Sequence, residues 1–386
     1  VYMIDRIHEK HKDKIEIVII STSKNLEIKF KSQSFKTYFI SMNSFERHIA
    51  FLRNYDPTVR RMKKYFFFKN KFEELLKKIN VDLVYFTGPS QYSLYLEKTD
   101  FIITIPDVSH REDLEFPEWT KSDTSEFHRR EEIISKSSIK AIAVITNAEI
   151  IKEKISYFYK VLKERIYIIN HQPSLEISNF KKPDLNVSKE VKTKYNLPQK
   201  YIFYPAMYLP HKNHKYIIDT IKIINSKKNF NLSAVFCGSD KGYLNKIKKY
   251  TCDEGLSDKI YFLGYVDDIH LPYIYLNSLA LTMPTFSGPT NIPPWEAFKM
   301  EVPVFYSNLE KIKNVYKEAV YYIDPFEPKS LAEGLIKVIN SNEERVKLIT
   351  NGKNLLNSID GNKEFNQIFE IIQKRQTIKS TWKFNN

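Results

Sequence analysis

Two segments in the second half of the chain combine residue types that suit phosphate and sugar binding. The first is Tyr204–His214, which contains Lys212 and Asn213 near its end. An apolar run precedes it and an amphipathic run follows it, so the pattern predicts a strand, a loop and a helix. Such junctions bind anions in doubly wound sheets, because helix N-termini offer unpaired N–H groups. Lys212 would neutralise a phosphate there; alternatively, Asn213 or His214 caps the helix and Lys212 is solvated.

The second segment is Pro284–Phe298, which again joins a predicted strand to a predicted helix. The proline pair 293–294 suits a first helical turn. Thr290 and Asn291 precede that turn, where unpaired backbone N–H groups point outward. Glu296 is expected in or near the first turn, where its carboxylate could accept two hydroxyls of a sugar such as ribose. The alternative is an exposed glutamate that only complements the helix dipole.

The elements that must position these segments alternate along nearly the whole chain. Short runs rich in Ile, Val, Phe and Tyr predict buried strands, and amphipathic stretches such as Lys215–Ser226 and Pro328–Ile339 predict helices between them. This alternation predicts an α/β protein with doubly wound parallel sheets. The predicted strands are Ile15–Ile20, Thr37–Ile40, Val81–Phe86, Phe101–Ile105, Ala141–Ile145, Ile166–Ile169, Tyr201–Tyr204, Leu232–Cys237, Ile260–Leu263, Leu279–Met283, Val302–Tyr306 and Ala319–Ile323.

A chain of 386 residues exceeds one ordinary core, so two Rossmann-like domains facing a central cleft are expected. A polar, proline-marked stretch separates the halves. The first half begins at what resembles a helix (Val1–Lys10), which suggests that its first strand lies outside the sequence. We expect an N-terminal domain, a linker, a C-terminal domain and a helix that crosses back to the first domain, at 1–172, 173–198, 199–362 and 363–386.

Composition narrows the class of partner. The net charge of +14 suits an anionic partner, namely nucleic acid, an acidic membrane surface or a phosphorylated small molecule, although Lys-, Ile- and Asn-rich usage could also reflect an AT-rich genome. Two cysteines, Cys237 and Cys252, allow neither a disulfide framework nor a cysteine-based metal site. We expect a cytoplasmic protein.

A stretch of cations and aromatic residues, Arg60–Lys69, leaves a contact with the membrane open. Apolar residues recur every three or four positions from Met62 to Ile79, as on one helical face. That face is either directed to the core or docked on anionic lipid, which would place the protein at the inner face of the membrane.

Taken together, three motifs resemble one known family. Pro-His-Lys-Asn-His (210–214), Phe-Leu-Gly-Tyr-Val (262–266) and Gly-Pro-Thr-Asn-Ile-Pro-Pro-Trp-Glu-Ala-Phe (288–298) are similar to glycosyltransferase family 4. They are closest to its bacterial-type branch, which builds surface polysaccharides, often with mannosyl donors. The resemblance implies a GT-B fold, a nucleoside-diphosphate sugar held by the C-terminal domain, and retaining, metal-independent transfer to a glycan or lipid-linked acceptor.

The resemblance also implies roles for individual residues. Lys212 would hold the donor diphosphate, and Glu296 would take the ribose hydroxyls. The first glutamate of the family's pair falls at Gly288 and its usual diphosphate arginine at Met207, so one carboxylate and one positive charge are missing. The other residues that the motifs place around the donor are Asn213, Gly238, Tyr265, Val266, Pro289, Thr290, Asn291 and Ile292.

In the first half, the segment Pro106–Arg111 resembles the family's His-Asp-x-x-His-Arg motif, with Pro106 in place of the first histidine. Asp107 and His110 would then border the cleft opposite the donor and join Lys212 and Glu296 as catalytic candidates. In the ordinary interpretation, Asp107 is a turn residue and His110 a surface imidazole.

Rival functions are a sugar-nucleotide epimerase and a non-catalytic nucleotide-sugar-binding subunit. Nucleic-acid binding ranks last, because no nucleic-acid-reading module is recognisable.

Overall fold

The computed structural model describes residues 11–24, 35–62, 69–120, 126–228, 230–288, 290–359 and 361–382, with the backbone alone for 361–365. The chain divides into two compact units. Unit 1 comprises Val1–Val108, Phe127–Ile169 and Asn362–Asn386, and unit 2 comprises Ser109–Glu126 and Asn170–Gly361. Residues 109–126 therefore leave the first half of the chain and pack with the second.

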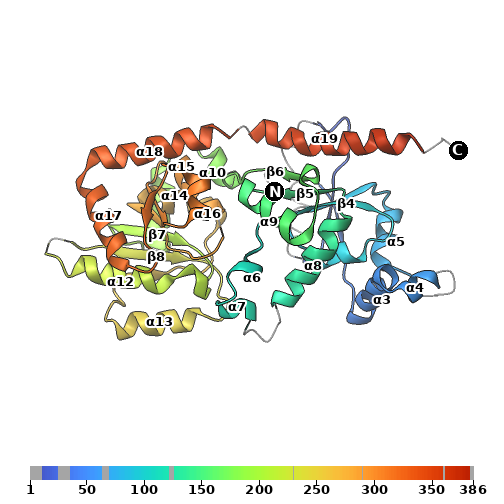
Figure 1. Ribbon diagram of the computed structural model, residues 1–386. Helices are drawn as coiled ribbons and strands as arrows, with labels where there is room; N and C mark the ends of the chain where they lie inside the picture. Colours follow the sequence, from blue (N-terminus) through green and yellow to red (C-terminus); the bar gives the residue numbers. More distant parts are fainter. Residues whose placement is uncertain are drawn as a thin grey trace. The chain divides into compact units, whose positions relative to one another are not determined.

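Unit 2 contains a six-stranded sheet in the order β12-β11-β10-β7-β8-β9 (Figure 1). Its neighbouring strands all pair in parallel. Because β7 lies beside both β8 and β10, the chain winds outward in two directions from this point, which is the doubly wound arrangement. The strands are β7 (Tyr201–Pro205), β8 (Ser233–Cys237), β9 (Ile260–Phe262), β10 (Ala280–Met283), β11 (Val304–Ser307) and β12 (Tyr321–Ile323).

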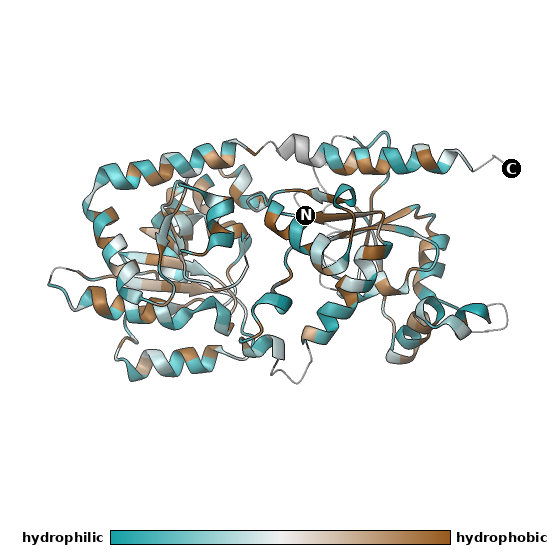
Figure 2. Cartoon of the chain, in the orientation of Figure 1, coloured by the Kyte–Doolittle hydropathy of each residue, from teal (hydrophilic) through white to brown (hydrophobic). Residues whose placement is uncertain are grey.

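The central strands of unit 2 are buried on both faces, which explains why their sequences lack polar alternation. Every residue of β8, β10 and β11 is buried. Figure 2 shows the same division, with apolar residues along the strands and polar residues on the outer helices. The helical elements are α6 (Ser109–Glu112), α7 (Pro117–Thr120), α10 (Leu175–Asn179), α11 (Leu185–Lys194), η4 (Pro210–Lys212), α12 (His214–Asn225), α13 (Leu244–Asp253), η5 (Asp268–His270), α14 (Leu271–Asn277), α15 (Ile292–Lys299), α16 (Glu310–Tyr316), α17 (Pro328–Asn340) and α18 (Asn342–Asn357).

The proline-marked stretch expected to link the halves is largely helical. It forms α10 and α11, and both helices contact α14 within unit 2. Ile177 of α10 and Val191 of α11 are fully buried in the core of unit 2. These two apolar side chains provide the reason for the packing, because their burial removes the stretch from solvent.

Unit 1 holds a four-stranded parallel sheet in the order β3-β4-β5-β6 and a separate parallel pair, β1-β2. The C-terminal helix α19 (Gly361–Ser380) belongs to this unit, because Ile368 and Ile371 join the apolar cluster around Ile102 and Ile145. The remaining elements are β1 (Val18–Ser21), β2 (Lys36–Phe39), α3 (Ser44–Tyr55), α4 (Pro57–Arg61), α5 (Lys71–Lys78), β3 (Leu83–Phe86), η2 (Gln91–Tyr95), β4 (Asp100–Thr104), α8 (Glu126–Lys140), β5 (Ala143–Thr146), α9 (Glu149–Tyr159), η3 (Lys163–Arg165) and β6 (Ile166–Ile168).

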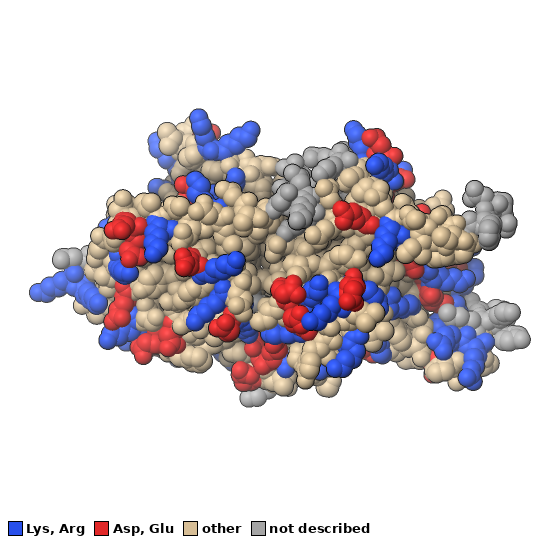
Figure 3. All heavy atoms as spheres, turned by 45° about the horizontal axis from the view of Figure 1, so that its top comes forward, with Lys and Arg blue, Asp and Glu red and all other residues tan. Residues whose placement is uncertain are grey.

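The expected α/β architecture with parallel sheets is confirmed, and each predicted strand overlaps an observed one. Most of the basic aromatic stretch (63–68), and the helix expected at the start of the chain, lie outside the described residues. Over the face in Figure 3, Lys and Arg side chains are interspersed with Asp and Glu. Within the described part of the chain, no helix is long and apolar enough to cross a bilayer.

Candidate functional site

The two segments singled out in the sequence meet at the point where the sheet of unit 2 changes direction. One follows β7 and the other follows β10, and these strands are neighbours. The carbonyl oxygen of His211 accepts hydrogen bonds from the Phe286 amide (2.9 Å) and the Thr285 hydroxyl (3.2 Å). Both loops therefore form one surface at the carboxyl ends of the strands, where ligands bind in open α/β sheets. We call residues 205–213 and 284–292 the switch-point loops.

Lys212 ends the short helix η4 and reaches from one switch-point loop to the other. Its ammonium group donates to Oδ1 of Asn291 at 3.3 Å. The hydroxyl of Tyr204 donates to the Lys212 carbonyl at 2.8 Å and thereby holds the backbone of Lys212 in place. The ammonium group thus lies at the residue that precedes α15, where an anion would meet both the cation and the helix N-terminus.

Asn291 is held too firmly to act as a ligand through its side-chain amide. Nδ2 donates to the Gly288 carbonyl (2.9 Å) and to the Tyr306 hydroxyl. The Asn291 amide N–H donates to the Tyr316 hydroxyl at 3.3 Å. The expectation that the N–H of Asn291 is unpaired is therefore wrong. Asn291 instead fixes the shape of the loop, because its side chain ties Lys212 to Gly288.

Thr290 and Ile292 retain the donors that the resemblance assigned to this loop. Among the described residues, neither backbone N–H has a protein acceptor, and the Thr290 hydroxyl is buried without a partner. Residues 293 and 294 are prolines and have no N–H. The helix start consequently offers few donors, and those of Thr290 and Ile292 are the ones available to a phosphate.

Glu296 is buried rather than exposed, with 4% of its surface accessible. It is the fifth residue of α15, beyond the first turn. The Tyr275 hydroxyl donates to Oε2 at 2.8 Å, and the Ser174 amide donates to Oε1 at 3.3 Å. Burial raises the pKa of Glu296, opposed by these hydrogen bonds. Each carboxylate oxygen still has one lone pair for a hydroxyl donor.

The side chains of Lys212 and Glu296 lie at two points along the same stretch, which runs from Asn291 into α15. Lys212 contacts Asn291, and Glu296 follows Asn291 by five residues. Such a separation corresponds to a rise of about 7.5 Å along a helix axis. A diphosphate and its adjacent ribose are of similar length, so one nucleotide can contact both ends of this stretch.

The loops after β7, β8 and β9 are joined beside the switch point. The Gly238 amide donates to the Gly264 carbonyl at 3.0 Å. A Cβ at Gly238 would lie 2.2 Å from the Ala206 carbonyl oxygen, so only glycine permits this approach. Next to Gly264, Tyr265 is 77% exposed and Val266 is buried. An exposed ring on this loop can stack on a planar base.

Other expected donor residues are distributed as follows. Met207 and Ile292 each expose 42% of their surface. Asn213 adopts a left-handed conformation (φ 58°) and precedes α12 without a side-chain capping bond. Its Nδ2 donates to the Pro325 carbonyl at 2.9 Å, so this side chain holds a neighbouring loop. Gly288 also has a positive φ of 83°, and Pro289 lies outside the described residues.

Sequence reasoning missed a buried pair beside Lys212. Nδ1 of His211 contacts Oε1 of Glu118, which lies on α7 in the segment that packs with unit 2. The His211 ring also lies near Trp119 and Phe116, at centroid distances of 6.4 and 6.0 Å. His211 is part of the 210–214 motif, but Glu118 carries no sequence signal, because the partnership depends on how 109–126 folds.

The two catalytic candidates of the first half differ in their surroundings. Asp107, in unit 1, accepts from the Arg130 guanidinium at 2.8 Å. His110, in unit 2, is fully buried beside Trp119. The interpretation of His110 as a surface imidazole is therefore wrong. Asp107 is an ion-pair partner of α8 rather than an unoccupied carboxylate.

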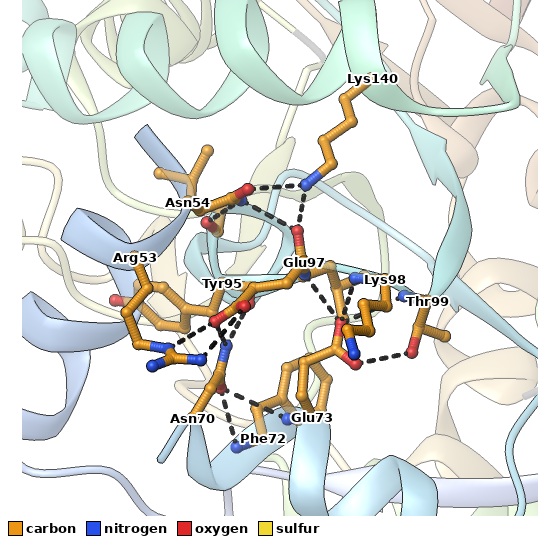
Figure 4. Close-up of polar contacts among 12 residues, drawn as sticks. Arg53, Asn54, Asn70, Phe72, Glu73, Tyr95, Glu97, Lys98, Thr99 and Lys140 are labelled. Carbon is orange, nitrogen blue, oxygen red and sulfur yellow. Dashed lines mark hydrogen bonds and ion pairs between the residues drawn. The ribbon is translucent and has the colours of Figure 1, made fainter. Parts of the chain in front are cut away.

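A hollow in unit 1, about 390 Å³ in volume, is a competing candidate. Acidic and basic side chains both line it, and two of the acids, Glu73 and Glu97, are shown with their partners in Figure 4. Glu73 accepts from the amides of Glu97, Lys98 and Thr99 at 2.7–3.1 Å, and Glu97 pairs with Arg53 at 2.8 Å. The hollow lies before β4, at the amino end of that strand, where parallel sheets do not place their ligands. Its acids already have partners, so we assign the hollow a structural role.

Comparison with known proteins finds similarity over the part of the chain that contains the switch-point loops. The family model Glycosyl transferases group 1 matches residues 188–355, which include both switch-point loops. O-antigen chain mannosyltransferase B of Escherichia coli is 24% identical over 154 residues, covering 39% of this chain and 40% of that protein. The matches span about half or less of the length of the curated relatives.

Solved structures share the fold over nearly the whole chain. A glycosyltransferase from Rickettsia africae aligns with a TM-score of 0.69 at 14% identity, covering 96% of this chain and 93% of that one. The Anabaena protein HepE, solved in complex with UDP-glucose, aligns with a TM-score of 0.71 at 12% identity, covering 97% and 95%. The fold is the GT-B fold of glycosyltransferases, as expected. Within this fold, residues 188–355 are similar to group 1 glycosyl transferases.

Proposed function

We propose that the protein transfers a hexose from a nucleoside-diphosphate sugar to a glycan or lipid-linked acceptor in surface polysaccharide synthesis, with retention of configuration and without a metal ion. The contact between Lys212 and Asn291 carries the proposal, because it places a cation and the start of α15 on one anion site. The group 1 domain match and the UDP-glucose in the HepE structure support this donor class. The mannosyltransferase relative favours mannose as the sugar.

In this proposal the donor diphosphate is the leaving group. Lys212 and the N–H groups of Thr290 and Ile292 stabilise the negative charge that develops as the glycosidic bond breaks. Glu296 accepts the ribose hydroxyls through its remaining lone pairs, and Tyr265 stacks on the base. The acceptor hydroxyl attacks from the face that the diphosphate leaves, and the leaving phosphate takes its proton. His110 acts indirectly, by supporting the fold around α7 through its contact with Trp119.

A donor panel tests the proposal. UDP- and GDP-sugars are incubated with the protein and a lipid-linked or oligosaccharide acceptor, and products are identified by mass spectrometry. A new glycoside with free nucleoside diphosphate is the expected result. An isomerised nucleotide sugar would instead identify an epimerase of the same fold.

The absence of a carboxylate at Gly288 and of a cation at Met207 favours a second candidate. A nucleotide-sugar-binding subunit of a larger transferase needs the donor site but not these charges. Donor binding without hydrolysis or transfer, across the whole panel, would support this candidate and contradict the enzyme.

A further inference from the structure

The switch-point loops hold little positive charge for a diphosphate. Lys212 is the only Lys or Arg in 205–213 and 284–292, and Met207 stands where the resemblance expects an arginine. A nucleoside diphosphate carries more than one negative charge at neutral pH, because the second ionisation of a terminal phosphate has a pKa of about 6. One lysine leaves part of that charge uncompensated.

His211 is adjacent to Lys212 and is oriented by an acid. Its Nδ1 contacts Oε1 of Glu118, and its backbone N–H lies 3.4 Å from the same oxygen. A carboxylate on Nδ1 selects the tautomer that carries its proton there, which leaves Nε2 as an acceptor. Among the described residues none bonds Nε2, and this nitrogen is not one of the fully buried unpartnered atoms. Nε2 can therefore receive a proton.

The charged groups around the imidazole are few. Glu118 faces it from α7 and Lys212 follows it in η4. Asp113, from the segment after α6, is paired with Lys311 of α16 at 3.2 Å. Among the described residues, a further titratable neighbour is His214, which stays neutral because burial lowers its pKa to about 3.

We propose that His211, oriented by Glu118, takes up a proton on Nε2 when a diphosphate binds, and that the imidazolium supplies the second positive charge of the donor site. This proposal rests on the proposed function and deepens it. The proton comes from solvent, the proton on Nδ1 stays on Nδ1 and is donated to the Glu118 carboxylate, and no bond between heavy atoms changes. His211 replaces the charge missing at Met207, and Glu118 is its positioning residue.

The electrostatics of the free protein agree with such uptake. Burial lowers the pKa of His211 below its ordinary value of 6.5, although the bond to Glu118 opposes this effect. The imidazole is consequently neutral at pH 7.5 before a ligand binds. A bound anion favours the charged form and raises the pKa, so binding couples to proton uptake, and affinity rises as pH falls from 8 to 6.5.

Calorimetry tests the coupling. UDP and GDP are titrated into the full chain at pH 7.5 in two buffers of different ionisation enthalpy, with uridine and guanosine as probes that lack phosphate. A buffer-dependent enthalpy for the diphosphates, and none for the nucleosides, reports proton uptake caused by phosphate. Titrations from pH 6.5 to 8 give the pH dependence.

Three variants locate the proton. His211→Gln should abolish the uptake and weaken diphosphate binding about 10-fold to 100-fold, the range for a lost charge-assisted hydrogen bond. Glu118→Gln keeps an acceptor for Nδ1 but removes the negative charge, so uptake should shrink while the fold is retained. Adding Met207→Arg to His211→Gln should restore affinity without restoring its pH dependence. His270→Gln, at a buried histidine bonded to Tyr195 and outside the switch-point loops, is the matched control and should keep the uptake.

The outcomes separate the two proposals. Diphosphate binding by the wild type without proton uptake, or unchanged uptake in His211→Gln, overturns the role of His211 and leaves the donor site intact. If the wild type binds neither diphosphate, both the proposed donor site and the role of His211 are contradicted. Loss of uptake in the His270→Gln control also contradicts the assignment, because the titrating group would then lie elsewhere.

Discussion

The hydrogen-bonded network around Glu73 and Glu97 in unit 1 and the switch-point loops of unit 2 both gather polar side chains beside a parallel sheet. In unit 1, Glu73 receives three backbone N–H groups and the Thr99 hydroxyl, and Glu97 receives Arg53 and Asn70. In unit 2, polar atoms of Thr290 and Glu118 remain without partners. Buried polar atoms are normally satisfied, so the Thr290 hydroxyl, which lies in a switch-point loop, is a candidate to be completed by a ligand.

The volume of the hollow and the state of the hydrogen bonds favour different regions as the ligand site. The hollow of about 390 Å³ lies over the satisfied network, whereas the unpartnered Thr290 hydroxyl lies in the loop that follows β10. Because a ligand gains little from acids that already have partners, hydrogen-bond completeness is the better guide here. The comparison predicts that substitutions in unit 2 change ligand binding and turnover, while those in unit 1 change stability.

The largest expected effect is on catalysis at Lys212. Lys212→Ala should lower kcat/KM for the true donor about 100-fold to 1,000-fold, as for loss of one group that stabilises developing charge. The free energy of unfolding should fall by less than about 1 kcal/mol, because the bond to Asn291 is long and partly exposed. Steady-state kinetics and urea denaturation measure the two. Wild-type turnover in this variant would contradict the assignment of the switch-point loops as the donor site.

A substitution in unit 1 should lower stability and leave ligand binding unchanged. Glu73→Ala leaves three backbone N–H groups and the Thr99 hydroxyl without their acceptor, and should lower the free energy of unfolding by about 2 kcal/mol. Nucleotide affinity, measured by calorimetry below the melting temperature, should not change. Glu74→Ala, beside it on α5 and paired only with exposed Lys69, is the control and should cost little. A specific loss of donor binding in Glu73→Ala would give the hollow a functional role.

Glu296→Gln tests whether the buried carboxylate of unit 2 is tuned for a ligand. Loss of the carboxylate should raise KM for the donor about tenfold, because hydrogen bonds from ribose to a charged acceptor are among the stronger ones.

The same variant makes a pH prediction. Burial raises the pKa of Glu296 above 4.5, so the folded state binds more protons than the unfolded state between pH 4.5 and the raised pKa. The carboxyl group therefore favours folding below pH 4.5, and that contribution is lost as pH rises through the folded pKa. The melting temperature of Glu296→Gln, relative to wild type, should rise between pH 4.5 and 7. A constant difference in thermal-shift assays would contradict the burial.

The smallest expected effect concerns loop geometry. Gly288→Ala places a Cβ at φ 83°, where the space is open and the nearest atom is Nδ2 of Asn291 at 3.5 Å. The cost should be about 1 kcal/mol of backbone strain, measured by urea denaturation. Gly255→Ala, at φ 69° with no atom of the described residues within 4 Å of the added Cβ, lies between α13 and β9, at the amino end of β9, and is the control. A larger loss of donor affinity at Gly288 alone would show that this loop shape serves binding.

Periodicity and composition were sufficient to predict the secondary-structure elements of this protein. Strands such as β8 and β10 are buried on both faces, and such burial demands continuous apolar runs that are visible in the sequence. The motif around Lys212 was visible for a similar reason, because a strand-to-helix junction leaves a local signature. Local signatures did not reveal that Glu296 is buried, since its burial depends on Tyr275 and Ser174, which come from other segments.

Taken alone, the sequence determined the α/β fold and the positions of the two loops that meet at the switch point. Only the tertiary structure decided which polar atoms are satisfied, because that depends on partners far apart in the chain. Asn213 bonds to Pro325 and is not available, Asn291 holds Lys212, and Glu118 reaches His211 across 93 residues of sequence. Hydrogen bonds and burial are properties of the folded chain, and they decide which side chains can meet a ligand.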